Sequence, residues 1–285
     1  MRSIVDDLGL DGDVPDRPQR IVSLVPNLSE VLWWWHLAPQ VVGVTDYCTA
    51  PPRAFDHAER LRGTKNPDIR RVIALRPDVV VANEEENREL DVRRLREAGC
   101  TVYVTRVRTV RDAADTLERL AAALGVAGAG TALRQTILRA LEGVRTQQRN
   151  LRTVCPIWRD GPDRGAEEAW WLVGDATFAG DLLTQTGFEL VLGQEPVPAR
   201  YPRATLAALA PEALEVALLP DEPYAFGAQD AEVFRAHGVR VRHLDGSALT
   251  WWGPRTPHAI ADLARLARQL AGPRRRVVRP SLQSP

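Results

Sequence analysis

Short apolar, β-branched runs alternate with helical patterns along most of the chain, and this alternation limits the fold more than any other feature. Four such runs lie in the first half, at Arg20–Val25, Val41–Val44, Val79–Ala82 and Val102–Thr105. Helical patterns stand between them, at Leu28–His36, Pro67–Leu75 and the segment ending before Gly99. Alternation at this spacing is typical of parallel β–α units, so the sequence predicts an α/β fold.

The second half repeats parts of this pattern. Leu206–Glu212 mirrors Ile73–Asp78, and Gly238–His243 mirrors Gly99–Val104. At 285 residues the chain is near the size at which a single core divides. Two α/β lobes of similar plan explain the symmetry, although a generic β–α repeat would give the same match.

A long helical pattern separates the halves. Val110–Leu124 and Thr131–Asn150 carry apolar residues at helical spacing. The second stretch would be about 30 Å long at 1.5 Å per residue, long enough to join two lobes as a stiff backbone. An ordinary packed surface helix is the alternative. We therefore expect an N-terminal α/β lobe at 1–125, a connecting helix at 126–150, a C-terminal α/β lobe at 151–271 and a disordered basic tail at 272–285. The polar stretch Gly161–Ala169 is expected to be a loop.

Charge composition bears on the class of partner. Acidic and basic residues both number 37, so no net field attracts nucleic acid or a membrane surface. The longest apolar runs are shorter than the ~20 residues needed to cross a bilayer. We expect a monomer that binds no nucleic acid and is not embedded in a membrane.

Cysteine usage and the N-terminal residues bear on location. Cys48, Cys100 and Cys155 are odd in number and show no C-x-x-C spacing, which favours a reducing compartment. Met1–Gln19 is acidic and lacks the features of a secretory signal. The sequence predicts a cytoplasmic protein, or a periplasmic or lipid-anchored one if the start is truncated.

Eight tryptophans fall into three clusters. Trp33–Trp35 lie on a predicted helix, so one or two of them are expected in the core. Trp158 and Trp171 flank a loop after a strand, and Trp251 and Trp252 lie in a segment too rich in turn formers to be core. Tryptophan above parallel strands suits a large planar ligand, with core packing as the alternative.

Other residues could complete such a site. Arg159 and Arg255 stand beside these tryptophans and could pair with a ligand carboxylate, phosphate or catecholate, or could be ordinary surface arginines. Tyr47, Tyr224 and Phe226 occupy comparable loops, where ligands of open parallel sheets bind.

The residue pattern offers little support for catalysis. The five histidines show no i, i+3 or i+4 pair, and no P-loop, G-x-G-x-x-G or G-x-S-x-G motif occurs. We assign no catalytic residue, no metal ligand and no built-in cofactor. Glu84–Glu86 could contact a cation or polar ligand, or could be a solvated acidic run.

An ordered set of segments resembles the helical-backbone binding proteins, the receptors that deliver cobalamin and ferric siderophores to importers. The resemblance extends from about Pro18 to Leu270 and includes the segments RIVSLVPNLSE at 20–30, VGVTDYCTAPP at 42–52, IWRD at 157–160, VGDATFAGDLL at 173–183 and WWGPR at 251–255. It implies two Rossmann-like lobes joined by one long helix with the ligand in the cleft between them, closest to the cobalamin-receptor-like branch.

The resemblance also implies residue roles. Tyr47 and Trp158 match aromatic cleft residues, and Trp251 and Trp252 match the aromatic loop of the second lobe. Thr64 stands where these receptors have a cleft tryptophan, and Arg70 and Ala204 stand where they have permease-docking glutamates. The predicted ligand-binding set comprises Asn27, Tyr47, Trp158, Arg159, Trp171, Tyr224, Phe226, Trp251, Trp252 and Arg255.

The sequence thus predicts a non-catalytic, two-lobed binding protein for a small-molecule metal chelate, cobalamin or a ferric siderophore, whose metal arrives inside the ligand. One alternative is the receptor of an importer with an ABC permease as partner. Another is a cytoplasmic tetrapyrrole enzyme or metal-insertion factor, which would need a histidine and a carboxylate facing each other. A sensor or scaffold with a vestigial cleft is the third.

Overall fold

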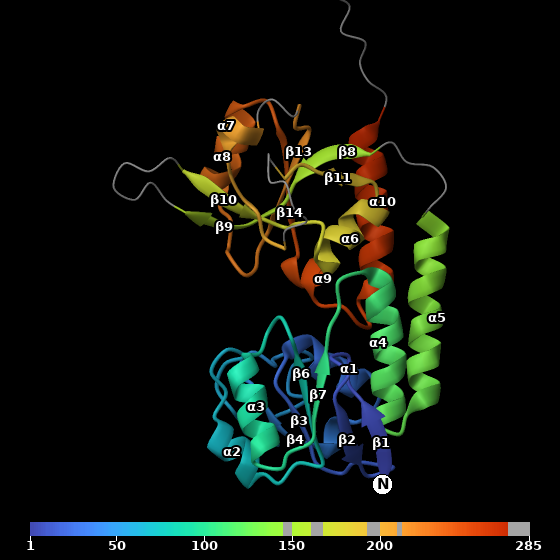
Figure 1. Cartoon of the computed structure of the whole chain (residues 1–285). Coiled ribbons are helices and arrows are strands. Elements are labelled where there is room, and N and C mark those ends of the chain that lie inside the picture. The colour runs from blue at the N-terminus through green and yellow to red at the C-terminus, as the bar shows by residue number, and fades with distance from the viewer. Residues whose placement is uncertain (145–149, 161–167, 193–199, 210–212, 273–285) are drawn as a thin grey trace, which may run out of the picture.

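The computed structural model describes residues 1–144, 150–160, 168–192, 200–209 and 213–272. Within them the chain forms two α/β lobes, one above the other, with helices α4 and α5 along one side (Figure 1). This confirms the predicted fold class.

The N-terminal lobe is built on a five-stranded parallel sheet in the order β5-β4-β3-β6-β7. All residues of the central strands β3 and β6 are buried, as expected for a parallel sheet covered on both faces. The strands are β3 Ile21–Ser23, β4 Val41–Val44, β5 Glu59–Arg60, β6 Val79–Asn83 and β7 Val102–Thr105. The other elements are the hairpin β1 Arg2–Val5 and β2 Asp11–Val14, the helices α1 Pro26–Trp34, α2 Ile69–Ala74 and α3 Glu89–Glu97, and the 3-10 helix η1 Ala38–Gln40.

Helix α1 is shifted from its predicted range. It begins at Pro26, because proline fits the first helical turn, where its missing N–H is not needed. It ends at Trp34, and His36 follows with a left-handed backbone at φ 60°. The shift matters because the start of α1 faces the other lobe.

The C-terminal lobe contains two sheets. The parallel sheet has the order β11-β8-β13-β14, with β8 Leu151–Val154, β11 Phe188–Leu190, β13 Val216–Pro220 and β14 Arg240–Leu244. An antiparallel sheet that the sequence did not predict has the order β12-β10-β9, with β9 Pro156–Asp160, β10 Ala169–Leu172 and β12 Arg203–Thr205. The helices are α6 Phe178–Gln185, α7 Leu206–Leu209, α8 Ala228–Ala236, α9 Gly246–Thr250 and α10 Thr256–Ala271.

Two antiparallel helices flank the lobes, α4 Val110–Ala123 and α5 Ala127–Val144. A capping box between Thr109 and Asp112 starts α4. Gly125 makes the turn with φ +79°, and a side chain there would strike the Asp16 carbonyl. Helix α5 contacts α4 and also α10 of the second lobe. Residues 145–149 of the predicted connecting helix, most of the predicted 161–169 loop and almost all of the predicted 272–285 tail lie outside the described residues, and the proposed domain boundaries stay a prediction.

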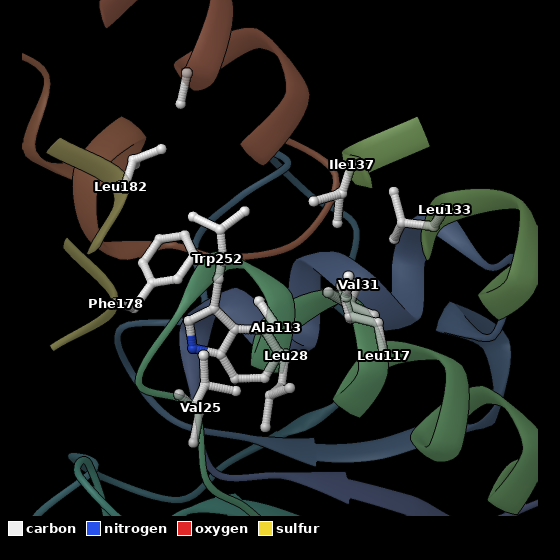
Figure 2. Packing of buried hydrophobic residues seen from close by; sticks show 14 of the residues in the cluster. Val25, Leu28, Val31, Ala113, Leu117, Leu133, Ile137, Phe178, Leu182 and Trp252 are labelled. Carbon is white, nitrogen blue, oxygen red and sulfur yellow. The ribbon is translucent and has the colours of Figure 1, made fainter. Parts of the chain in front are cut away.

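The two lobes share one apolar cluster. It joins Val25 and Leu28 of the first lobe to Phe178, Leu182 and Trp252 of the second (Figure 2). Polar contacts reinforce the junction: Arg255 Nε donates to both carboxylate oxygens of Glu30, at 2.9 and 2.8 Å. Packing at the junction therefore fixes how the lobes face each other. Across the described ranges, no helix is long and apolar enough to span a membrane.

Candidate functional site

A cleft of about 780 Å³ lies between the lobes. Its first wall is made by segments that follow β3, β4, β5, β6 and β7, and its second wall by segments around β9, β10, β13 and the start of α6. Open parallel sheets bind ligands beyond the carboxyl ends of their strands, and both sheets direct these ends toward the cleft.

Tyr47 gives the first wall an exposed aromatic ring, with 62% of its surface accessible. The turn that carries it is tied down on both sides, by Asp46 N–H donating to Arg62 O at 2.8 Å and by Cys48 N–H donating to Thr45 O at 3.1 Å. Burial raises the pKa of the Cys48 thiol, which accepts a hydrogen bond from Ser29 at 3.0 Å. Tyr47 therefore presents an exposed ring to the cleft from a turn that backbone hydrogen bonds hold in place.

Asn27 and Thr64 also lie on the first wall. Asn27 is buried, and its Nδ2 donates to the carbonyl of Trp252 at 3.0 Å across the lobe junction. Thr64 is buried too, and its carbonyl accepts from Asn87 Nδ2 at 2.9 Å. The first wall thus combines one free aromatic ring with polar groups held by their neighbours.

The adjacent tryptophans of the second wall have different environments. Trp251 is half-buried, lines the cleft and lies under the Arg255 guanidinium, 4.8 Å from the ring centroid. Trp252 also borders the cleft, but only 6% of its surface is exposed because its ring enters the apolar cluster between the lobes. The expectation that this segment is too rich in turn formers to be core is wrong for Trp252.

The remaining predicted ligand-binding residues are absent from the cleft wall as far as the chain is described, and the structure does not bring them together with Tyr47. Trp158 packs edge-on against Tyr224 at 5.3 Å, and Trp171 Nε1 donates to Asp160 at 3.1 Å. These two tryptophans are cross-strand partners on the antiparallel sheet. Because neighbouring strand residues point to opposite faces, Ile157 borders the cleft while Trp158 does not.

Phe226 and the two arginines have structural partners. Phe226 is buried in the core of the second lobe beside Trp170. Arg159 pairs with Asp230 at 2.6 Å and with Glu168. Arg255 pairs with Glu30 and borders a separate groove. Both guanidinium groups are therefore paired with carboxylates in this structure, and their role in binding a ligand anion stays a prediction.

Several cleft residues were not predicted. They are Val173, Thr177 and Phe178 around the start of α6, together with Tyr201, Glu222 and Pro223. Glu222 could have been found, because it lies in the PDEPYAF segment after a predicted strand. Tyr201 had no such signal.

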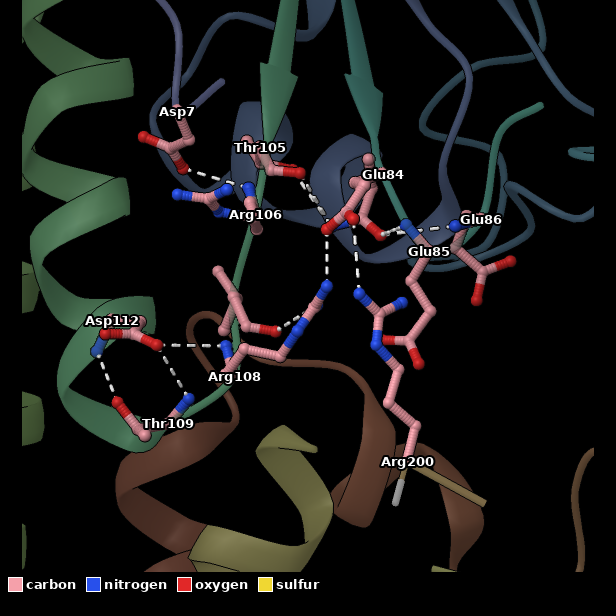
Figure 3. A network of polar contacts seen from close by, with 12 residues as sticks. Asp7, Glu84, Glu85, Glu86, Thr105, Arg106, Arg108, Thr109, Asp112 and Arg200 are labelled. Atoms are coloured by element: carbon pink, nitrogen blue, oxygen red, sulfur yellow. Dashed lines mark hydrogen bonds and ion pairs between the residues drawn. The ribbon is translucent and has the colours of Figure 1, made fainter. Parts of the chain in front are cut away.

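Glu85 and Glu86 line the first wall and are only partly exposed, so a solvated acidic run is wrong for them. Tyr201 donates its hydroxyl to Glu85, and Arg108 and Arg200 pair with the neighbouring Glu84 (Figure 3). Burial raises the pKa of Glu86, although Lys65 opposes this shift.

Glu222 faces the cleft from the second wall. Burial is the main cause of its raised pKa, and Asp221 and Asp245 add to the shift while a hydrogen bond from Thr250 opposes it. The segment is held against α9 by Gly246, whose N–H donates to Asp221 at 2.7 Å. A side chain at Gly246 would clash with the Glu222 backbone at 2.9 Å.

A second groove, of about 570 Å³, lies over α1 and α10 and includes Trp33, Trp34, His243 and His258. Both Trp33 and Trp34 are exposed, whereas Trp35 is buried as expected for one member of this cluster. In the described part of the chain, no group of three or more histidine, cysteine or acidic side chains could hold a metal ion.

Comparison with known proteins gives the class of this fold and site. Residues 21–217 match the periplasmic binding protein family. The vitamin B12-binding protein of Vibrio cholerae serotype O1 is 28% identical over 133 residues, which cover 47% of this chain and 48% of that relative. The aligned region thus spans about half the length of the curated relative.

Solved structures agree on the fold. The periplasmic vitamin B12-binding protein of Vibrio cholerae superposes with a TM-score of 0.74 at 20% identity, covering 90% of this chain and 99% of that one. The periplasmic heme-binding protein of Roseiflexus sp. RS-1 gives 0.72 at 18% identity, covering 89% and 99%.

The chain belongs to the periplasmic binding protein family. Its two-lobed α/β fold is the fold of these solved binding proteins, so the predicted resemblance is confirmed for the family and the fold. The matched family is one of binding proteins by its description, which agrees with the prediction of a non-catalytic protein.

Ala204 is one of the two positions that the resemblance aligns with permease-docking glutamates. It is buried at 6% exposure, lies on β12 and pairs with Trp170 of β10. The Ala204 side chain packs in the core of the second lobe, and its correspondence to a docking position stays a prediction. Arg70, the other of these two positions, is exposed on the surface of the first lobe.

Proposed function

We propose that the protein binds one metal chelate of the corrinoid type in the cleft between its lobes and releases it unchanged. The observation that carries this proposal is the pair of aromatic rings, Tyr47 and Trp251, that line one cleft from opposite lobes. Aromatic rings offer a large planar ligand a broad contact area at little cost in conformational entropy. The vitamin B12-binding relatives give independent support.

Neighbouring side chains supply the polar contacts. Asn66 borders the cleft together with Tyr47, and Thr250 borders it next to Trp251. Amide and hydroxyl groups of this kind can accept from or donate to the amide side chains at the edge of a corrinoid. The proposed site does not include the predicted residues that lie off the cleft wall, which are Trp158, Arg159, Trp171, Tyr224, Phe226 and Arg255.

Titration with cyanocobalamin tests the proposal. We expect saturable quenching of tryptophan fluorescence with one ligand per chain, confirmed by calorimetry. Tyr47→Ala and Trp251→Ala should each weaken binding by about 5- to 150-fold, the effect of removing a 1–3 kcal/mol aromatic contact.

Trp34→Ala is the matched control, because Trp34 is exposed but lies in the other groove. Its affinity should equal that of the wild type. Cyanocobalamin that fails to bind, or binding weakened equally by all three substitutions, would refute the proposed site.

We also propose that the protein works in the cytoplasm and uses no ABC permease. The three unpaired cysteines, two of them buried, support a reducing compartment. The periplasmic relatives support the alternative, in which the protein is the receptor of an importer. Fractionation of native cells tests the location, and reconstituted transport with the wild-type protein tests the partner. If the wild-type protein drives uptake of the chelate, the protein is an importer receptor and this proposal is wrong.

A further inference from the structure

The walls of the cleft are acidic on both lobes. Asp46, Glu85 and Glu86 border it from the first lobe, and Glu222 borders it from the second. Among the lining residues that the structure describes, Lys65 is the only one with a basic side chain. Its ammonium group donates to the backbone carbonyl of Glu85.

Nearby guanidinium groups are occupied by other carboxylates. Arg108 and Arg200 both pair with Glu84, at 2.5 and 3.1 Å. Arg255 pairs with Glu30 and Arg159 with Asp230. Using any of them for a ligand anion would break an existing ion pair and leave its carboxylate without compensation, which is costly when the group is partly buried.

Glu86 and Glu222 border the cleft from opposite lobes. Both are partly buried, and their raised pKa values show that the cleft already disfavours ionisation there. A ligand carboxylate close to either group would add Coulomb repulsion, which is stronger in a partly buried cleft than in bulk water and is reduced by salt.

We infer that the cleft selects neutral or cationic chelates with hydrogen-bonding edges and rejects polyanionic ones, with Glu86 and Glu222 as the selecting residues. This inference rests on the proposed function and adds the charge class of its ligand. A neutral corrinoid with amide groups at its edge would bring no negative charge near the carboxylates of the cleft. A porphyrin bearing two propionates or a ferric tricatecholate would meet carboxylates on both walls. Of the two chelates expected from the sequence, the anionic siderophore is therefore the poorer fit.

The test compares three probes by calorimetry: cyanocobalamin, hemin and ferric enterobactin. The wild type should bind cyanocobalamin at least about tenfold more tightly than either anion. Glu86→Gln with Glu222→Gln removes both charges at nearly constant shape. It should raise the affinity for each anion, relative to the affinity for cyanocobalamin, by about tenfold or more.

Two controls separate charge from structure. Glu232→Gln removes an exposed carboxylate on α8 and should leave all three affinities unchanged. Added salt should narrow the affinity gap between neutral and anionic probes more in the wild type than in the double variant, because the variant keeps only Asp46 and Glu85 of the acidic residues that line the cleft.

The outcomes distinguish this inference from the proposed function. Equal wild-type affinity for all three probes, or a double variant that keeps the wild-type preference, overturns the charge inference and leaves the corrinoid site standing. Anion binding gained by the double variant, with no corrinoid binding by either protein, supports the charge inference and refutes the proposed function. Failure of every probe with both proteins overturns both.

Discussion

Replacing Trp252 by alanine should damage stability, whereas the same change at the adjacent Trp251 should damage binding. Trp252 is 6% exposed and packs against Val25, Leu28 and Phe178 at the lobe junction. A buried tryptophan removes about 200 Å² from water, worth about 5 kcal/mol at ~25 cal/mol per Å². Measured losses for such substitutions are about 3–5 kcal/mol, so we expect a loss in this range.

Trp251→Ala serves as the matched comparison. Its ring is half-buried, borders the cleft and has the Arg255 guanidinium as a neighbour at 4.8 Å. We expect it to lower the unfolding free energy by about 1 kcal/mol, the typical value for a partly buried site. Urea denaturation followed by circular dichroism measures both variants. Equal stability losses for the two tryptophans would refute the assignment of one to the core and the other to the cleft wall.

Three more predictions follow from single features. Burial raises the pKa of Glu86 above its unfolded value, so ionisation of Glu86 lowers the stability of the folded protein as pH rises from about 4.3 through the folded pKa. Glu86→Gln should therefore raise the melting temperature at about pH 8, with no gain below about pH 4. Arg200→Ala should lower the unfolding free energy by less than about 1 kcal/mol in urea titration, because the Arg200–Glu84 pair is 40% and 32% exposed; a loss above 2 kcal/mol would contradict this. Burial raises the pKa of all three thiols, to about 12 for Cys155, but Cys100 is the only one of them that is not fully buried. A thiol reagent should therefore modify Cys100 first, and mass spectrometry of the digested protein would reveal any other order.

The predicted strands agree best with the structure where every residue of a strand is buried. Val79–Ala82 was predicted and β6 runs from Val79 to Asn83, because a central parallel strand reads as one uninterrupted apolar run. The antiparallel sheet was missed, since β10 pairs with β12 more than thirty residues away and no local pattern marks that pairing.

The site was harder to predict than the fold. Tyr47 and Trp251 could be found because each follows an element that ends at the cleft. Trp158 could not be separated from Ile157, since a strand shifted by one residue exchanges the two faces. Arg159 pairs with Asp230 and Arg255 pairs with Glu30. These partners are distant in sequence, so the ion pairs could not be predicted from the sequence.

The position of cobalt in a crystal grown with cyanocobalamin tests the central claim most directly. Anomalous scattering at the cobalt edge locates the metal without assumptions about the surrounding residues. We predict one cobalt per chain, in the cleft between Tyr47 and Trp251. A cobalt peak in the groove beside Trp33 and Trp34 instead, or no peak at saturating ligand, would contradict the assignment of the cleft as the binding site.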